Sequence, residues 1–180
     1  MENLDNIKVI LVRHGESVAN SKGISQGNKD KWTDTPLSQK GKEQAKKVAE
    51  RLKKEDIKVI YSSDLKRAEE TAQEINKFHN VKIKLDKRLR DMLNGEDLEA
   101  FIKKCQDFLN DIKKEDINAL VVAHGSTCLT LLAITTGNRK EGGKLVRKHS
   151  GKYDNTSISV LEKKENGYNI KTIGCIKHLD

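Results

Sequence analysis

Residues 7–17 read IKVILVRHGES, and this stretch decides how the chain folds. Its first six residues are aliphatic apart from Lys8, which is typical of a strand buried in a parallel sheet. The run then passes directly into polar residues that begin with Arg13 and His14. In open α/β sheets, ligands bind at the carboxyl ends of the parallel strands. The stretch therefore predicts an α/β fold with functional side chains at one edge of its sheet.

The same arrangement recurs twice further along the chain. Residues 57–61 (IKVIY) run into SSDLKR, and residues 119–123 (ALVVA) run into HG. Because neighbouring parallel strands end at the same edge of a sheet, we expect the residues that follow them to meet there. The expected set comprises two arginines and two histidines: Arg13, His14, Arg67 and His124.

Apolar residues at helical spacing separate these strands. Alternating strands and helices predict a three-layer α/β fold, in which a mainly parallel sheet carries helices on both faces. Its length of 180 residues favours a single domain spanning residues 1–180. Helices are expected over residues 38–52 (N-cap Ser38), 62–75 (capped by residues 62–64), 97–112 and 124–136, an edge strand over 81–85, and a terminal hairpin from 158–161 and 168–173. Residues 137–151, which are rich in basic side chains, are interpreted as a mobile basic rim or as an ordinary solvated loop.

Composition excludes several classes of function. The formal net charge is +8, but lysine and glutamate alternate along the expected helices and no recognition motif accompanies the charge, so we expect no nucleic-acid partner. The apolar runs are too short to cross a bilayer, and the amino terminus does not resemble a secretion signal, so we expect no membrane association. Three widely spaced cysteines without a C-x-x-C pair indicate reduced thiols and a cytoplasmic location.

Two arginines and two histidines at one edge suit the transfer of a phosphoryl group. Arginine binds phosphate oxygens through a planar fork, and an imidazole with one nitrogen held presents the other as a nucleophile. A second histidine, when protonated, stabilises negative charge on the phosphoryl oxygens. This chemistry needs no metal ion and no cofactor. A metal site made from His14, His124 and Asp91 is disfavoured, because the neighbouring arginines would repel a cation.

The stretch LVRHGES resembles the signature of the histidine phosphatase superfamily, which includes the cofactor-dependent phosphoglycerate mutases. Further blocks follow in the family's order, so the resemblance covers nearly the whole chain and implies a phosphoglycerate mutase-like fold. These blocks are Asn20 with Gln26-Gly27, Asp34 and PLSQKGKEQA (residues 36–45); SSDLKRAEETA (62–72); VVAHG (121–125); and DNTSI (154–158).

The resemblance also implies a role for each matching residue. His14 would be the phosphorylated nucleophile, and Gly15 would approach closely enough for its carbonyl to orient the imidazole. The phosphoryl group would be held by Arg13, Arg67 and His124, and the substrate-binding residues would be Asn20, Gly15 and Gly125.

The expected proton donor departs from the family pattern. Family members that hydrolyse phosphate esters usually carry a glutamate where this chain has Asp91, which is one methylene shorter. Asp91 is the first candidate for the acid, Glu96 is the alternative, and a merely solvated loop carboxylate at Asp91 remains open. A general acid must come within hydrogen-bond reach of the leaving oxygen.

These features predict a metal-independent phosphatase that hydrolyses a small phosphorylated metabolite through a phosphohistidine. The alternatives are a phosphoglycerate mutase, a protein phosphohistidine phosphatase and a phosphate-binding regulatory module without activity. The segment after Asp91 is too short for the cap of larger relatives, and this minimal cap weakens the case for a mutase, which must exclude water. The substrate and the oligomeric state stay open.

Overall fold

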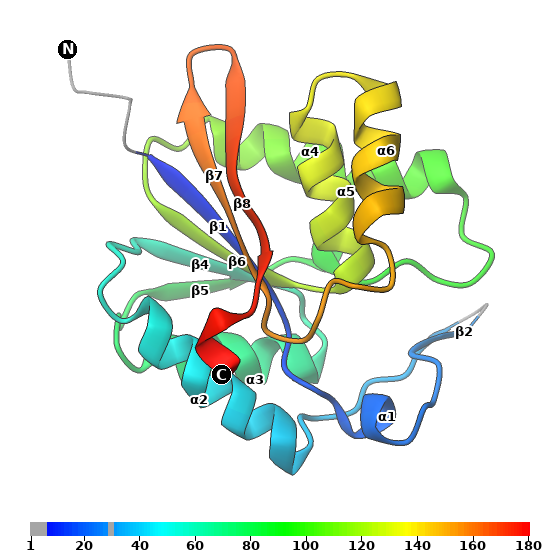
Figure 1. The fold of residues 1–180 in the computed structure, drawn as a ribbon, viewed down its shortest axis with the longest axis vertical. Helices are drawn as coiled ribbons and strands as arrows, with labels where there is room; N and C mark the ends of the chain where they lie inside the picture. The colour runs from blue at the N-terminus through cyan, green and yellow to red at the C-terminus, as the bar shows by residue number, and fades with distance from the viewer. Residues whose placement is uncertain (1–6, 29–30) are drawn as a thin grey trace.

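The computed structural model describes residues 7–28 and 31–180 and centres on a six-stranded sheet in the order β5-β4-β6-β1-β7-β8 (Figure 1). Four strands are parallel: β1 (Lys8–Arg13), β4 (Val59–Ser62), β5 (Lys82–Leu85) and β6 (Ala119–Ala123). A hairpin made of β7 (Ile158–Lys164) and β8 (Gly167–Cys175) adds two antiparallel strands beside β1. A separate two-stranded ribbon pairs β2 (Gly27–Asn28) with β3 (Lys31–Trp32). The predicted mainly parallel sheet and terminal hairpin are confirmed.

Helices cover both faces of the sheet, as predicted (Figure 1). The helices are α1 (Val18–Ser21), α2 (Gln39–Leu52), α3 (Lys66–Asn76), α4 (Leu98–Lys113), α5 (Gly125–Thr135) and α6 (Arg139–His149), with 3-10 turns η2 (Lys87–Leu89) and η3 (Lys177–Leu179). Alternate strand residues point to opposite faces. Ile10 and Val12 therefore pack with α2 and α3, whereas Val9 and Leu11 pack with α4 and α5.

The start of α2 follows the prediction from sequence. The hydroxyl of Ser38 accepts a hydrogen bond from the Gly41 N–H at 3.0 Å, which satisfies one of the free donors in the first turn. Ser38 also donates its hydroxyl to Glu16 at 2.7 Å. The cap therefore ties α2 to the loop that follows β1.

The predicted cap of α3 is wrong. The helix begins at Lys66 after Leu65, which offers no side-chain cap. The polar residues expected to cap it are used in tertiary contacts instead: Ser63 binds His124, and Asp64 binds Arg90 through two hydrogen bonds of 2.6 Å. These contacts fix the end of β4 against two other segments.

The loop predicted over residues 137–151 is also wrong, because most of it forms α6. Asn138 caps the helix by accepting hydrogen bonds from the N–H groups of Lys140 and Glu141. A Cβ at Gly142 would lie 2.7 Å from the Ala133 carbonyl oxygen, so the glycine lets α6 pack closely on α5. Two adjacent glycines lower helix propensity, and this tertiary contact overrides that preference.

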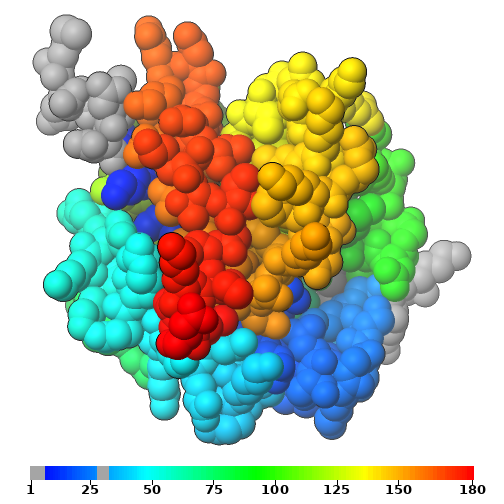
Figure 2. Space-filling model, viewed as in Figure 1, coloured from blue at the N-terminus to red at the C-terminus, as the bar shows by residue number. Residues whose placement is uncertain are grey.

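The carboxyl-terminal segment packs against α2. The Lys47 ammonium donates to the Leu179 carbonyl at 2.6 Å. In the space-filling view, the red terminal segment lies directly on the cyan helix (Figure 2). Within the described part of the chain, no helix is both long and apolar enough to cross a membrane.

Candidate functional site

The register of the sheet brings three strand ends together. Arg13 lies opposite Ala123, and Ser62 lies opposite Val122. The backbone pairing continues past the strands, since the His14 N–H donates to Ala123 O at 2.9 Å. His14, Ser63 and His124 therefore emerge at one edge of the sheet, as the sequence predicts.

His14 is held in one orientation and one tautomer. Its Nδ1–H donates to the Gly15 carbonyl at 2.7 Å, which leaves Nε2 with a lone pair. The Arg67 Nε–H approaches this Nε2 at 3.3 Å. Only 1% of His14 is exposed. The imidazole is thus arranged to present Nε2 as a nucleophile.

The loop around His14 is fixed by residues that the sequence analysis did not assign to the site. The Gly15 N–H donates to the Thr71 hydroxyl at 3.1 Å, and Thr71 donates in turn to the Arg67 carbonyl at 2.7 Å. On the other side, the Asn155 side-chain amide donates to the His14 carbonyl at 2.9 Å. Thr71 and Asn155 lie in the blocks that resemble the family pattern. That resemblance is the signal in the sequence that could have identified them as part of the site.

His124 faces His14 across the site. The two rings meet edge to face with their centroids 5.0 Å apart. Nε2 of His124 is hydrogen-bonded to the Ser63 hydroxyl at 3.0 Å, and Nδ1 is buried without a hydrogen-bond partner among the described residues. His124 is the N-cap residue of α5, so the first turn of that helix begins beside it.

Two guanidinium groups complete this side of the site. The Arg67 side chain is fully buried and donates from Nη1 to the Thr33 carbonyl at 3.0 Å, while Arg13 donates to the Tyr153 carbonyl. Arg13 Nε and Arg67 Nη2 are buried without hydrogen-bond partners in the described residues. Buried polar groups in proteins are normally satisfied, so unpaired donors beside a nucleophilic imidazole favour an anion as the bound group.

The electrostatics of the site keep both imidazoles neutral in the free protein. Burial lowers the pKa of His14 well below its ordinary value, and His124, Arg67 and Arg13 lower it further. Burial, followed by Arg67 and Arg13, lowers the pKa of His124 in the same way. Burial also lowers the pKa of Arg67 to about 10, so its guanidinium stays charged at neutral pH. Burial first, and then the two arginines, therefore disfavour a protonated second histidine in the free protein.

Asp91 lies close to both arginines. Its carboxylate raises the pKa of Arg13 and of Arg67, in opposition to the larger effect of burial. Oδ1 of Asp91 accepts hydrogen bonds from the Ser126 hydroxyl and from the Met92 N–H. The structure thus places Asp91 at the same edge as the four residues predicted from the strand ends.

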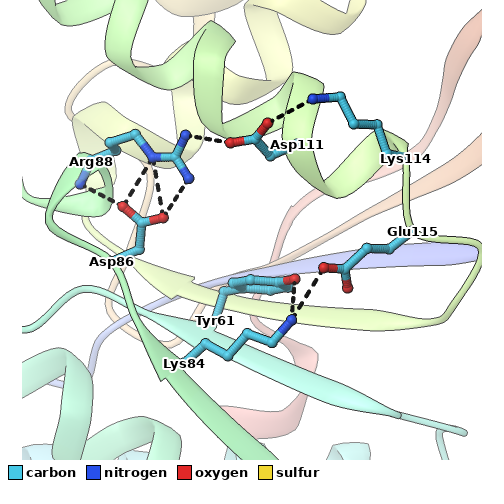
Figure 3. A network of polar contacts seen from close by, with 7 residues as sticks. All are labelled: Tyr61, Lys84, Asp86, Arg88, Asp111, Lys114 and Glu115. Carbon is cyan, nitrogen blue, oxygen red and sulfur yellow. Dashed lines mark hydrogen bonds and ion pairs between the residues drawn. The ribbon is translucent and has the colours of Figure 1, made fainter.

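The segment that carries Asp91 is anchored on two sides. Arg88 binds Asp86 on its own segment and Asp111 on α4, as Figure 3 shows. Arg90 binds Asp64 through a fork of two 2.6 Å hydrogen bonds, and the Arg90 carbonyl accepts from Thr127 at 3.2 Å. These contacts fix the backbone on the amino-terminal side of Asp91.

The alternative acid lies elsewhere. The Glu96 carboxylate is paired with Lys104 on α4 at 2.9 Å and also accepts from the Leu93 N–H. Within the described part of the chain, no hydrogen bond or ion pair joins Glu96 to the two arginines or the two histidines, whereas the charge of Asp91 acts on both arginines. The placement favours Asp91 over Glu96 as the group nearest to a bound phosphoryl.

The remaining predicted binding residues have structural tasks as well. Asn20 and Ser17 form a capping box, in which Asn20 Oδ1 accepts from the Ser17 N–H and the Ser17 hydroxyl accepts from the Asn20 N–H, both at 3.1 Å. The Ser17 hydroxyl also lies 3.0 Å from Asn20 Oδ1, so the side-chain amide nitrogen is the part of Asn20 left to donate to a substrate. A Cβ at Gly125 would lie 3.7 Å from Arg13 Nε. In the described residues, no three histidine, cysteine or carboxylate side chains form a group fit to hold a metal ion.

The family profile described as "Histidine phosphatase superfamily (branch 1)" matches residues 9–96 and 91–176. A protein of Hydrogenobacter thermophilus named "Putative phosphoserine phosphatase 2" is 30% identical over 164 residues, which cover 72% of this chain and 79% of that protein. The 2,3-bisphosphoglycerate-dependent phosphoglycerate mutase of Thermoplasma acidophilum is 41% identical over 103 residues, which cover 57% of this chain and 48% of the mutase. The chain thus spans about half the length of that mutase.

Solved structures share the fold. Phosphoserine phosphatase from Entamoeba histolytica, crystallised with 3-phosphoglyceric acid, superposes with a TM-score of 0.80 at 24% identity and covers 96% of this chain and 99% of its own. The phosphoglycerate mutase-like fold predicted from the sequence is confirmed. Since the family profile covers most of the chain, the protein belongs to the histidine phosphatase superfamily and is an enzyme of its phosphatase and phosphoglycerate mutase type.

Proposed function

We propose that this enzyme hydrolyses a small phosphorylated metabolite, without a metal ion, through a phosphohistidine formed at His14. The observation that carries the proposal is the oriented His14 imidazole, whose Nε2 lies 3.3 Å from Arg67 Nε in a site where Arg13 Nε, Arg67 Nη2 and His124 Nδ1 are buried without partners among the described residues. Such donors suit the equatorial oxygens of a transferring phosphoryl group. We further propose that residues 1–180 act as one domain with a minimal cap, in the cytoplasm.

The reaction follows from this arrangement in two steps. His14 Nε2 forms a bond to phosphorus as the bond from phosphorus to the leaving oxygen breaks, and the Asp91 carboxyl gives its proton to that oxygen. Water then attacks the phosphohistidine, Asp91 takes a proton from it, and the nitrogen–phosphorus bond breaks. The two arginines and His124 hold the phosphoryl oxygens in both steps.

Hydrolysis is favoured over mutase activity by the segment beside Asp91. Residues 90–97 connect η2 to α4 without a helix or strand, and the Asn94 N–H donates to the Gly27 carbonyl at 3.1 Å. A mutase must exclude water while its intermediate is rephosphorylated. A short connection of this kind leaves little polypeptide to cover the substrate.

The test is hydrolysis of p-nitrophenyl phosphate in excess chelator. We expect wild-type activity to resist the chelator and His14→Ala to abolish it, while His149→Ala in the last turn of α6 retains it. Circular dichroism checks that both variants fold. Activity retained by His14→Ala would exclude the phosphohistidine. Conversion of 3-phosphoglycerate to 2-phosphoglycerate faster than its hydrolysis would favour a mutase instead.

A further inference from the structure

The carboxyl group of Asp91 is held by a hydroxyl from a different element of the fold. Ser126 lies in the first turn of α5, and its Oγ donates to Asp91 Oδ1. The Met92 N–H lies between the two groups, 3.1 Å from Oδ1 and 3.3 Å from the Ser126 oxygen. Because His124 is the N-cap residue of α5, the strand end that places His124 also places this hydroxyl.

We propose that Ser126 is a positioning residue that makes the short aspartate effective as the leaving-group acid. The terminal torsion of an aspartate is broad, so an unrestrained carboxyl samples many orientations. Two donors on Oδ1 restrict that rotation, and they occupy both lone pairs of this oxygen. No lone pair of Oδ1 is then left for the proton that the acid transfers. This inference rests on the proposed phosphatase function.

The contact strengthens as the reaction proceeds. When the nitrogen–phosphorus bond forms at His14 and the bond from phosphorus to the leaving oxygen breaks, the proton of the Asp91 carboxyl passes to the departing oxygen and the carboxyl becomes a carboxylate. Hydrogen bonds to an ionised acceptor are stronger than those to a neutral one, so Ser126 stabilises the transition state more than the ground state. The stabilisation of the transition state by Ser126 is therefore larger for esters whose leaving oxygen is more basic and must be protonated as it departs.

The first experiment compares leaving groups and needs no knowledge of the natural substrate. We expect Ser126→Ala to lower kcat/KM, which reports the step that releases the leaving group, by about 10- to 100-fold for phenyl phosphate and by less than about threefold for p-nitrophenyl phosphate. Ser126→Thr, which keeps the hydroxyl, restores the ratio. Thr135→Ala removes a hydroxyl at the other end of α5, where it donates to the Leu132 carbonyl, and leaves the ratio unchanged.

A double-mutant cycle then assigns the effect to Asp91. In an Asp91→Asn background, Ser126→Ala produces no further loss with phenyl phosphate if the hydroxyl acts through the acid. Equal losses with both esters, or an undiminished loss in the Asp91→Asn background, overturn the inference. The effect of His14→Ala on the wild-type activity tells the proposed function apart from the positioning role of Ser126. If that dependence holds and Ser126→Ala is neutral, the positioning role alone fails; if it does not hold, the proposed function fails.

Discussion

The backbones of Gly15 and Gly41 meet with no room for a side chain on either residue. A Cβ at Gly15 would lie 2.6 Å from the Gly41 carbonyl oxygen, and a Cβ at Gly41 would lie 1.9 Å from the carbonyl oxygen of Glu16. Helix α2 therefore rests directly on the loop that orients His14. Any side chain at this contact must displace the loop, the helix or both.

The first prediction concerns Gly41, which lies inside a helix where alanine is ordinarily favourable. We expect Gly41→Ala to lower the free energy of unfolding by about 1–3 kcal/mol through overpacking, and to lower kcat by displacing His14. Urea unfolding and p-nitrophenyl phosphate hydrolysis measure the two effects. Gly143→Ala is the matched control. Its Cβ would contact only the end of the Arg147 side chain, so it should stabilise the protein by about 1 kcal/mol. A stable, active Gly41→Ala variant would contradict the close contact.

The second prediction concerns the unpaired guanidinium donors. Inorganic phosphate should raise Tm at constant ionic strength, with a stabilisation of about 2.7 kcal/mol at 100 times its Kd. Arg67→Gln should remove this effect, since the Arg67 fork lies at His14 Nε2. Arg139→Gln makes the same change of charge on the exposed face of α6 and should respond to phosphate like the wild type. An undiminished phosphate response in Arg67→Gln would place the anion elsewhere.

The third prediction concerns pH and stability. The pKa of both His14 and His124 is lowered in the folded protein, so below the ordinary histidine pKa of about 6.5 the unfolded chain binds more protons. Stability is therefore fully present above that pH and falls as the pH falls, by up to about 1.4 kcal/mol per pH unit for each histidine. Urea unfolding between pH 7.5 and 5 measures the slope. His124→Asn should reduce the slope of the unfolding free energy against pH by up to about 1.4 kcal/mol per pH unit. An unchanged slope would argue against a neutral His124.

The fourth prediction concerns the anchor of the acid. Arg90→Ala removes the two hydrogen bonds to Asp64 and frees the backbone next to Asp91, so kcat for phenyl phosphate should fall by about tenfold. Asp111→Ala removes the outer partner of Arg88 (Figure 3). The Asp111 carboxylate is half exposed. That exposed pair contributes at most about 1 kcal/mol, and kcat should stay unchanged. Equal losses of kcat in the two variants would mean that the fork has no special role.

The sequence predicts the parts of the site that depend on local patterns. Apolar runs mark β1, β4 and β6, and the residues just beyond them converge because parallel strands end at one edge. The same reasoning fails where a tertiary contact decides. Residues 137–151 are interpreted from the sequence as a basic rim or a solvated loop, yet most of them form α6, in which Gly142 lets the helix pack closely on the Ala133 carbonyl. Ser63 is of a residue type that often caps helices, yet its hydroxyl is hydrogen-bonded to His124.

Contacts between segments that are distant in the sequence cannot be predicted from local sequence patterns either. Nothing in the sequence around Ser126 indicates that its hydroxyl reaches Asp91, because the contact joins the start of α5 to a loop on another segment. The neutral state of His124 depends on how deeply it is buried and on the nearby guanidinium groups. Both properties belong to the assembled fold, which periodicity and spacing do not describe.

The position of β1 between β6 and β7 has a consequence for how the chain folds during synthesis. Val9 pairs with Ala119 on one side and with Leu161 on the other. The first neighbour of β1 is therefore made about 110 residues later, which takes roughly 5 to 20 seconds on a ribosome. Until then an apolar strand is exposed with both edges unpaired, as in an aggregation-prone intermediate. His14, at the end of β1, is therefore translated well before the neighbouring strand of its sheet, and the edge that brings it beside Ser63 and His124 can assemble only after β6 has been made.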